Sequence, residues 1–364
     1  MADHQDLGPY GDWVRHAVAE NGLFPPVDRP GLTSDEVRRL IGSASDGEPL
    51  APEAGRRWTR DGVSGEEVSW SVGYGPRTQA WLLRPADASG PLPGVLALHG
   101  HDGFKYFGKE KIADGPDATP EPVRELRADL YEGVAFAGEL ARRGYSVLVH
   151  DVFLWGSRRF PPELVTGTSE PDPAAYNTAA RRHEHVVAKY CTVLGTSPAG
   201  VVAFEDRVAA RYLRSRTDLV AGPIGCVGLS GGGFRAALLH ATCADISAAC
   251  VVGAMSTYPA VLDRHVAPHT WMFFPPGLAA RGDWPDVAAA RAPVPLLVQY
   301  TRDDHLFTLD GMAAAHERLT ARYRQAGSPD SYVGEFHDGP HHFDRTMQAS
   351  AFAHLDRWLR VPST

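Results

Sequence analysis

A single serine lies among glycines in the segment Gly228–Gly232, which reads GLSGG. An apolar run precedes the serine and a helical pattern follows it, so the segment is expected at a strand-to-helix turn. Small flanking residues let such a turn project the serine hydroxyl, and the helix N-terminus beneath it stabilises negative charge. Ser230 is therefore a candidate nucleophile, although the same glycines could surround an incidental serine.

A nucleophilic serine requires a base, and the base requires an acid that orients it. Asp303 and Asp304 follow the expected strand 295–300, and His341 and His342 follow the expected strand 332–337. Catalytic groups of open α/β sheets gather at the carboxyl ends of the strands. We therefore expect an acid and a histidine at the edge of the sheet that carries Ser230.

Other polar clusters favour structural roles. His183 and His185 flank Glu184 in a helical pattern, where such neighbours face different ways, so a solvated charged face is expected rather than a metal site. His99 is expected to tie down the loop that follows its strand. Lysines 105, 109 and 111 either form a surface loop, which we favour, or help to hold an acidic substrate.

The elements that must position these residues follow an alternating pattern. The segment 66–85 alternates apolar and polar residues on both sides of a Gly/Pro turn, which predicts an antiparallel hairpin. Short, nearly unbroken apolar runs then predict buried strands at 94–99, 145–151, 224–230, 247–255 and 295–300. Helical patterns separate the runs at 126–143, 198–215, 232–243, 309–326 and 344–359. The pattern predicts an α/β protein with a mostly parallel, doubly wound sheet.

Residues 1–62 are predicted to form an N-terminal helical extension, in which Thr33 and Glu36 have the spacing of a capping box. Residues 63–364 form the predicted main domain. Its three longest connections are insertions at about 101–125, 152–197 and 256–293, and long ordered loops commonly act as pocket walls or lids. Packing over the sheet edge is the alternative role for the aromatic-rich third connection.

Five motifs in chain order resemble those of the α/β-hydrolase superfamily, particularly its dienelactone-hydrolase-like and acetyl-esterase-like members. These motifs are LALHGHDG, HDVFLWGSR, GLSGGG, TRDDHLFTLDGM and GPHHFD, and the resemblance spans about residues 66–360. It implies an α/β-hydrolase fold with about eight strands. It also selects Asp304 over Asp303 as the acid and His341 over His342 as the base.

The resemblance further implies an oxyanion hole made by two backbone N–H groups. One belongs to Gly231, and the other to His101 or, as the less favoured choice, Asp102. Substrate contacts are expected from the long connections, at Phe104, Trp155, His269 and Trp271.

The function implied is a serine esterase, which cleaves a small carboxylic ester or related acyl compound through an acyl-enzyme and needs no metal or organic cofactor. An acyltransferase, thioesterase, cyclase or C–C bond hydrolase is the first alternative, because the fold determines the nucleophile and not the leaving group. A non-catalytic binding protein of the same fold is the second alternative.

The composition of the chain limits the classes of partner that the protein is expected to bind. The 364 residues carry a net charge of −8 with no basic block, which argues against nucleic acid. No apolar run approaches the roughly 18 residues that span a bilayer, and the first residues lack a secretory pattern, so a cytoplasmic location is expected. The four cysteines show no C-x-x-C spacing, which disfavours disulfides and zinc. A homo-oligomer is left open.

Overall fold

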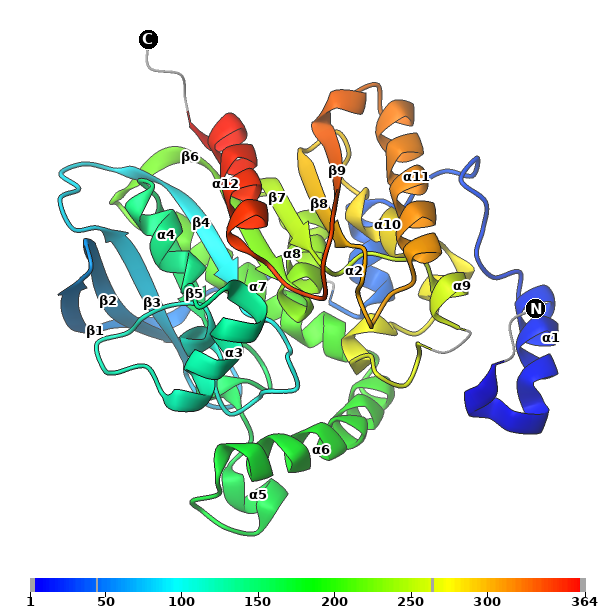
Figure 1. Ribbon diagram of the computed structural model, residues 1–364, viewed down its shortest axis with the longest axis horizontal. Helices are drawn as coiled ribbons and strands as arrows, with labels where there is room; N and C mark the ends of the chain where they lie inside the picture. Colours follow the sequence, from blue (N-terminus) through cyan, green and yellow to red (C-terminus); the bar gives the residue numbers. More distant parts are fainter. Residues whose placement is uncertain (1–3, 44, 263–264, 361–364) are drawn as a thin grey trace.

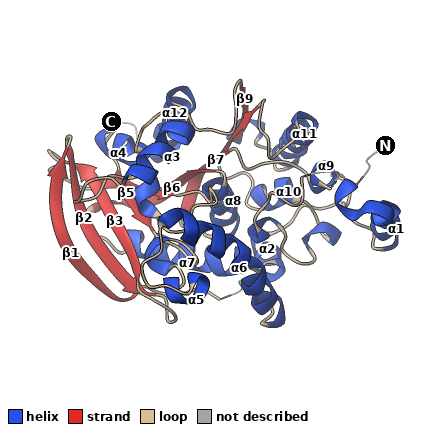
Figure 2. Ribbon diagram, turned by 60° about the horizontal axis from the view of Figure 1, so that its bottom comes forward, coloured by secondary structure: helices blue, strands red, loops and turns tan. Residues whose placement is uncertain are grey.

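The computed structural model describes residues 4–43, 45–262 and 265–360, which form one nine-stranded sheet with helices on both faces (Figures 1 and 2). The strands are β1 Leu50–Arg60, β2 Val63–Ser71, β3 Thr78–Pro85, β4 Leu92–Leu98, β5 Ser146–His150, β6 Leu219–Leu229, β7 Ile246–Val252, β8 Leu296–Thr301 and β9 Tyr332–His337. The α-helices are α1 Gly11–Glu20, α2 Ser34–Leu40, α3 Glu121–Tyr131, α4 Phe136–Arg142, α5 Pro162–Thr166, α6 Pro173–Val193, α7 Pro198–Arg214, α8 Gly231–Thr242, α9 Tyr258–Val261, α10 Trp284–Ala288, α11 Leu309–Gln325 and α12 Arg345–Leu359.

The strand order in the sheet is β1-β2-β3-β5-β4-β6-β7-β8-β9. The strands β1, β2, β3 and β5 pair antiparallel, and from β5 to β9 every neighbouring pair is parallel. The carboxyl ends of β4, β6, β8 and β9 therefore meet at one edge of the sheet. This edge is where the loops that carry the candidate residues begin.

Two apolar cores cover the two faces of the sheet. One joins the sheet to α2, α7, α8, α10 and α11, and the other joins it to α4 and α12. Residues 95–98 of β4 are completely buried, which explains why the strand is an unbroken apolar run. The sheet is thus a rigid support between two helical layers.

The predicted hairpin is present as β2 and β3, and the prediction of a mostly parallel sheet built from the five apolar runs is confirmed. The capping box is also present. The Glu36 N–H donates to the Thr33 hydroxyl oxygen, and the Thr33 N–H donates to the Glu36 carboxylate. The predicted helix 126–143 is wrong as one element. It is two helices, α3 and α4, because Glu132 and Gly133 take left-handed conformations between them.

The extension contains more than helices. Leu50–Arg60 form β1, an almost entirely exposed edge strand paired with β2, so this part of the expected helical segment is wrong. Because almost every residue of β1 is exposed, its sequence lacks the alternation of apolar and polar residues by which a strand is recognised. Residues 1–3 and 44 of that segment, and residues 263–264 of the third connection, lie outside the described residues.

The connection 152–197 is largely helical, because it contains α5 and the 21-residue α6. These two helices lie at the lower edge of Figure 1, apart from the layers that cover the sheet. Within the described residues no single helix is long and apolar enough to cross a membrane; α6 and α7, bent by 84° at their junction, meet those criteria of length and composition only together.

Candidate functional site

Ser230 lies at the turn between β6 and α8, with backbone angles of φ 58° and ψ −121°. A positive φ is unusual for a residue with a side chain, and it is held here by a hydrogen bond from the Ser230 N–H to the Val252 carbonyl at 2.8 Å. The flanking glycines are sterically required: a Cβ on Gly228 would lie 2.5 Å from the Gly232 carbonyl carbon, and one on Gly232 would lie 2.1 Å from the Leu98 oxygen. The local sequence therefore permits the tight turn that displays Ser230.

Asp304 and His341 form a hydrogen-bonded pair at the ends of β8 and β9. The Asp304 carboxylate accepts from His341 Nδ1 at 2.6 Å, from the Thr301 hydroxyl at 3.1 Å and from the Leu306 N–H at 2.8 Å. Burial alone would raise the pKa of Asp304, but these bonds hold its pKa below the ordinary value. An ionised Asp304 keeps the proton on His341 Nδ1, which leaves Nε2 as an acceptor.

The neighbouring residues make other contacts. Asp303 is exposed and accepts the Gly339 N–H, while the His342 ring lies 3.7 Å from Asp344 and is bonded to neither aspartate of the loop after β8. His341 Nε2 is buried and has no hydrogen-bond partner among the described residues. His341 and Ser230 line the same cavity, so the structure brings Ser230, Asp304 and His341 together.

The backbones of Gly231 and His101 lie close together, next to the turn that carries Ser230. A Cβ on Gly231 would lie 2.4 Å from the His101 backbone nitrogen, so the two backbones are in close approach. Gly231 is the first residue of α8, and its N–H has no acceptor within the helix. Two backbone N–H groups beside the Ser230 hydroxyl can bind an oxygen that gains negative charge. Asp102, the alternative donor, takes a left-handed conformation one residue further along the loop.

No family model matches the chain. A Bacillus subtilis (strain 168) protein named "Putative hydrolase YtaP" is 24% identical over 326 residues, which are 89% of this chain and 98% of that protein. A solved structure named "a putative acetyl xylan esterase", from Bacteroides fragilis NCTC 9343, superposes with a TM-score of 0.64 at 17% identity and covers 90% of this chain and 82% of its own. A glucuronoyl esterase from Solibacter usitatus has a TM-score of 0.61 at 15% identity, with 91% and 95% covered.

The chain has the α/β-hydrolase fold. The superposition covers 90% of the chain, and the sheet of this chain has antiparallel strands at one end and the order β3-β5-β4-β6 before the turn that carries Ser230. In an α/β-hydrolase fold, substrates meet the protein at the carboxyl ends of the parallel strands.

A cavity of about 700 Å³ opens over Ser230. Its walls come from the loop after β4, from α6, from the third long connection and from the loops after β8 and β9. The lining residues are His101, Asp102, Gly103, Leu130, Thr178, Arg181, Arg182, Glu184, Ser230, Gly231, Phe234, Ala267, Pro268, His269, Thr270, Trp271, His305, Leu306, Phe307 and His341. His269 and Trp271, two of the four expected substrate contacts, are among them.

Phe104 and Trp155 do not line that cavity, so the geometry is against their expected contact with substrate. The Phe104 N–H donates to the His101 carbonyl at 3.0 Å, and this turn directs its ring toward Phe107 instead. Trp155 is buried beneath the loop, where its indole N–H donates to the same carbonyl at 3.3 Å and its ring lies edge-to-face with the His101 ring. Trp155 thus supports the loop that carries the candidate oxyanion donor.

Glu184 binds the same loop from α6. His101 Nδ1 accepts the Gly103 N–H at 3.0 Å, so Nε2 carries the hydrogen and donates to Glu184 Oε2 at 2.9 Å. Glu184 also forms an ion pair with Lys105 at 2.8 Å and accepts from the Thr270 hydroxyl at 2.5 Å. Burial alone would raise the pKa of Glu184, but His101 and Lys105 hold its pKa far below the usual range.

Two sequence-based expectations are therefore wrong. Glu184 is not on a solvated charged face, because it is buried among the partners just described. The three lysines are not on the surface either, since Lys105, Lys109 and Lys111 are 2%, 8% and 0% exposed. Each is paired with a buried carboxylate, Lys109 with Asp151 at 3.0 Å and Lys111 with Asp102 at 2.8 Å.

Sequence reasoning also missed a buried cluster around Arg235 on α8. Its guanidinium pairs with Asp206 at 2.7 Å, donates to the His99 carbonyl at 3.1 Å and approaches His150 Nε2 at 3.1 Å. Arg235 thereby joins the end of β4, just before the His101 loop, to the helix that begins at Ser230. An arginine five residues after the serine, in a mostly apolar helix, was the available signal. His99 itself is buried and contacts the Gly100 carbonyl, outside the cavity.

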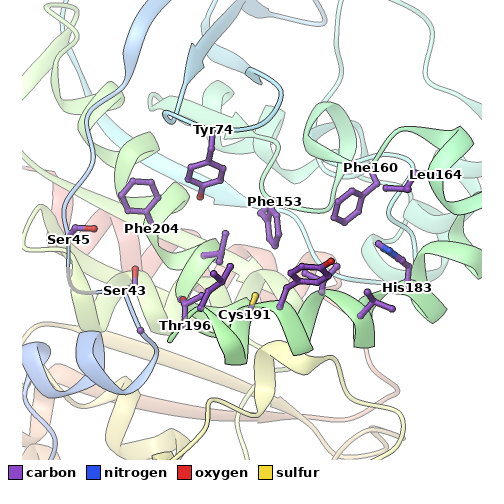
Figure 3. A pocket seen from close by; sticks show the side chains of 17 residues that line it. Ser43, Ser45, Tyr74, Phe153, Phe160, Leu164, His183, Cys191, Thr196 and Phe204 are labelled. Atoms are coloured by element: carbon purple, nitrogen blue, oxygen red, sulfur yellow. The ribbon is translucent and has the colours of Figure 1, made fainter.

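A second cavity of about 700 Å³ is lined by residues of α6, of α7 and of the connection after β5 (Figure 3). Tyr74, Phe153 and Phe204 face α6 across it, and Phe160 and Leu164 close one end. This cavity is mostly apolar and contains none of the candidate catalytic residues. In the described ranges 4–43, 45–262 and 265–360, no group of three or more His, Cys, Asp or Glu side chains is placed to hold a metal ion.

Proposed function

We propose that the protein is a serine hydrolase that cleaves a carboxylic ester through an acyl-enzyme. The observation that carries the proposal is the Asp304–His341 hydrogen bond at 2.6 Å, in which His341 Nε2 is left without a partner within the described residues and His341 lines the same cavity as Ser230. A histidine held in this way, in the same cavity as a serine on a strained turn, can serve as the base that a nucleophilic serine requires. The names of the structural relatives, which include two esterases, support an ester as the substrate.

In the first half-reaction, Ser230 Oγ attacks the ester carbonyl while His341 Nε2 takes the hydroxyl proton. The Gly231 and His101 N–H groups bind the oxyanion, and Asp304 holds the imidazole and stabilises its charged form. His341 then protonates the leaving alcohol, and the acyl group stays on Ser230. In the second half-reaction, His341 activates a water molecule that releases the carboxylic acid and restores Ser230.

A fluorophosphonate probe and 4-nitrophenyl acetate test the proposal. The wild-type protein is expected to react with the probe at Ser230 and to release 4-nitrophenol, and Ser230→Ala is expected to do neither while keeping its melting temperature. His341→Ala should lower turnover strongly, and His342→Ala should not, because only His341 is bonded to Asp304. A folded wild-type protein that is not labelled would exclude a serine hydrolase and favour a binding protein of the same fold.

A further inference from the structure

Two arginines on α6 border the cavity over Ser230. Arg181 and Arg182 line it together with Thr178, and the three positions lie on one face of the helix because they are three and four residues apart. Both arginine side chains are exposed. Within the described residues, neither guanidinium forms a salt bridge, a hydrogen bond or a contact over an aromatic ring. The buried lysines of this region, in contrast, are paired with carboxylates: Lys105, Lys109 and Lys111 each form a salt bridge.

The acidic groups of the same cavity are already neutralised. Glu184 is bound by His101 and Lys105, and Asp102 is bound by Lys111. Burial also lowers the pKa of His269 to about 4, so this ring is neutral at pH 7. The two guanidinium groups therefore give the cavity a positive wall in a chain whose net charge is −8. Such a local field attracts an anion.

The positive wall is close to the reaction centre. A Cβ on Gly103 would lie 3.4 Å from Arg181 Nη1, so this guanidinium lies over the loop that begins with the His101 N–H. The positive charge of Arg181 also contributes to lowering the pKa of the buried Lys105, after burial itself and against the effect of Glu184. Because Arg181 and Ser230 line the same cavity, a ligand that places its carbonyl at Ser230 can extend toward Arg181.

We propose that this cavity selects an ester that carries a second, ionised carboxylate, and that Arg181 and Arg182 bind this carboxylate. The planar guanidinium matches the two oxygens of a carboxylate, and a charge-assisted hydrogen bond is stronger than a neutral one. Because the contact is remote from the reacting bond, it acts on binding and positioning of the substrate. The inference rests on the proposed function, whose substrate class it narrows.

Two pairs of esters test the inference. On the acyl side, 4-nitrophenyl hydrogen adipate is compared with 4-nitrophenyl 6-methylheptanoate, in which an isopropyl group replaces the carboxylate. On the alcohol side, 4-acetoxybenzoate is compared with 4-isopropylphenyl acetate. In at least one pair, the wild-type protein is expected to favour the anion by about tenfold in kcat/KM at low salt. The pair that shows the preference tells which side of the ester carries the carboxylate.

The double variant Arg181→Gln/Arg182→Gln is expected to lose about tenfold in kcat/KM for the anionic ester and less than about twofold for its neutral match. Added NaCl should lower the wild-type preference, because exposed charges are screened, and should leave the variant unchanged. Lys189→Gln is the matched control, since Lys189 is exposed on α6 and does not line the cavity. Equal preference in wild type and double variant, or an equal loss in the control, would overturn the inference.

A binding measurement separates this inference from the proposed function. Calorimetry with the Ser230→Ala variant reports affinity for the same ester pairs without turnover. Tighter binding of the anionic ester, lost when both arginines are changed to glutamine, supports the inference even if the wild-type protein proves unreactive. If the wild-type protein is labelled and hydrolyses the neutral esters but binds both members of each pair equally, the carboxylate site is wrong and the hydrolase proposal stands.

Discussion

Replacing Glu184 by glutamine tests whether the buried carboxylate on α6 holds the candidate oxyanion loop. Glutamine keeps the shape of the side chain and one acceptor oxygen, but it removes the negative charge that faces Lys105 at 2.8 Å and His101 at 2.9 Å. Lys105 is 2% exposed, so the substitution leaves a buried ammonium group without its counter-charge. The expected result is a loss of both stability and activity.

The magnitude follows from the geometry. At an effective dielectric constant of about 20, two unit charges at the 2.8 Å Lys105–Glu184 distance attract each other by about 6 kcal/mol. Removing one partner of a buried pair typically costs about 3–5 kcal/mol. Because the glutamine oxygen still accepts one hydrogen bond, we expect the free energy of unfolding to fall by about 3 kcal/mol. The loosened His101 N–H should lower kcat by about tenfold to a hundredfold, less than complete loss of an oxyanion donor.

The pH dependence gives a second signature. The folded-state pKa of Glu184 lies below its ordinary value of 4.5, so the carboxylate stabilises the protein above that pH and the contribution fades as the pH falls further. The difference between Glu184→Gln and wild type should therefore shrink in acid. Burial lowers the pKa of Lys105 below 10.5, and without Glu184 it falls further. The variant should then regain stability as the pH rises toward that value, because its folded state releases the Lys105 proton first.

Urea unfolding at several pH values, with 4-nitrophenyl acetate turnover in parallel, measures both effects. Glu163→Gln on α5 is the control, because Glu163 is exposed and lies outside this network. The double variant Lys105→Met/Glu184→Gln removes both charges and should recover most of the lost stability. A Glu184→Gln protein within about 1 kcal/mol of wild type, or a double variant no more stable than Glu184→Gln alone, would refute the reasoning.

Three further outcomes are expected. Asp304→Asn should lower kcat by about 10⁴, because the histidine is held in the wrong tautomer, whereas the exposed Asp303→Asn should leave kcat within about twofold in the same ester assay. Gly232→Ala should lower the urea midpoint and the activity together, since its Cβ would lie 2.1 Å from the Leu98 oxygen. Arg235→Met should lower the free energy of unfolding by about 3 kcal/mol, because it leaves Asp206 buried without its 2.7 Å partner.

The placement of the candidate catalytic residues could be predicted from the sequence because these residues follow strands of one sheet. An apolar run without alternation predicts a strand covered on both faces, and the carboxyl ends of such strands share one edge. Ser230 and Asp304 follow such runs, His341 follows the expected strand 332–337, and the structure brings the three residues together. The choice of Asp304 over Asp303 came from the resemblance, and the hydrogen bonds to His341 and Thr301 agree with that choice.

The ion pairs could not be predicted, because their partners are distant in the sequence. Lys105 and Glu184 are separated by 79 positions, and each reads alone as a charged surface residue. Only the fold shows that α6 brings the carboxylate to the buried lysine. The break between α3 and α4, in contrast, could have been predicted from the sequence. Gly133 lies within the expected helix, and a glycine commonly marks a helix end.

The position of α6 explains why the proposed substrate contacts are harder to predict from the sequence than the candidate catalytic residues. Glu184 is bonded to the His101 loop, while Arg181 and Arg182 border the cavity, so one helix both supports the candidate oxyanion donor and gives the cavity a positively charged wall. This helix lies outside the strand–helix alternation that makes the fold recognisable. Changes in α6 can therefore alter substrate choice while β6, β8 and β9 keep Ser230, Asp304 and His341 in place. The same helix position also makes the two roles separable, because the exposed arginines can be changed without touching the buried Glu184 network.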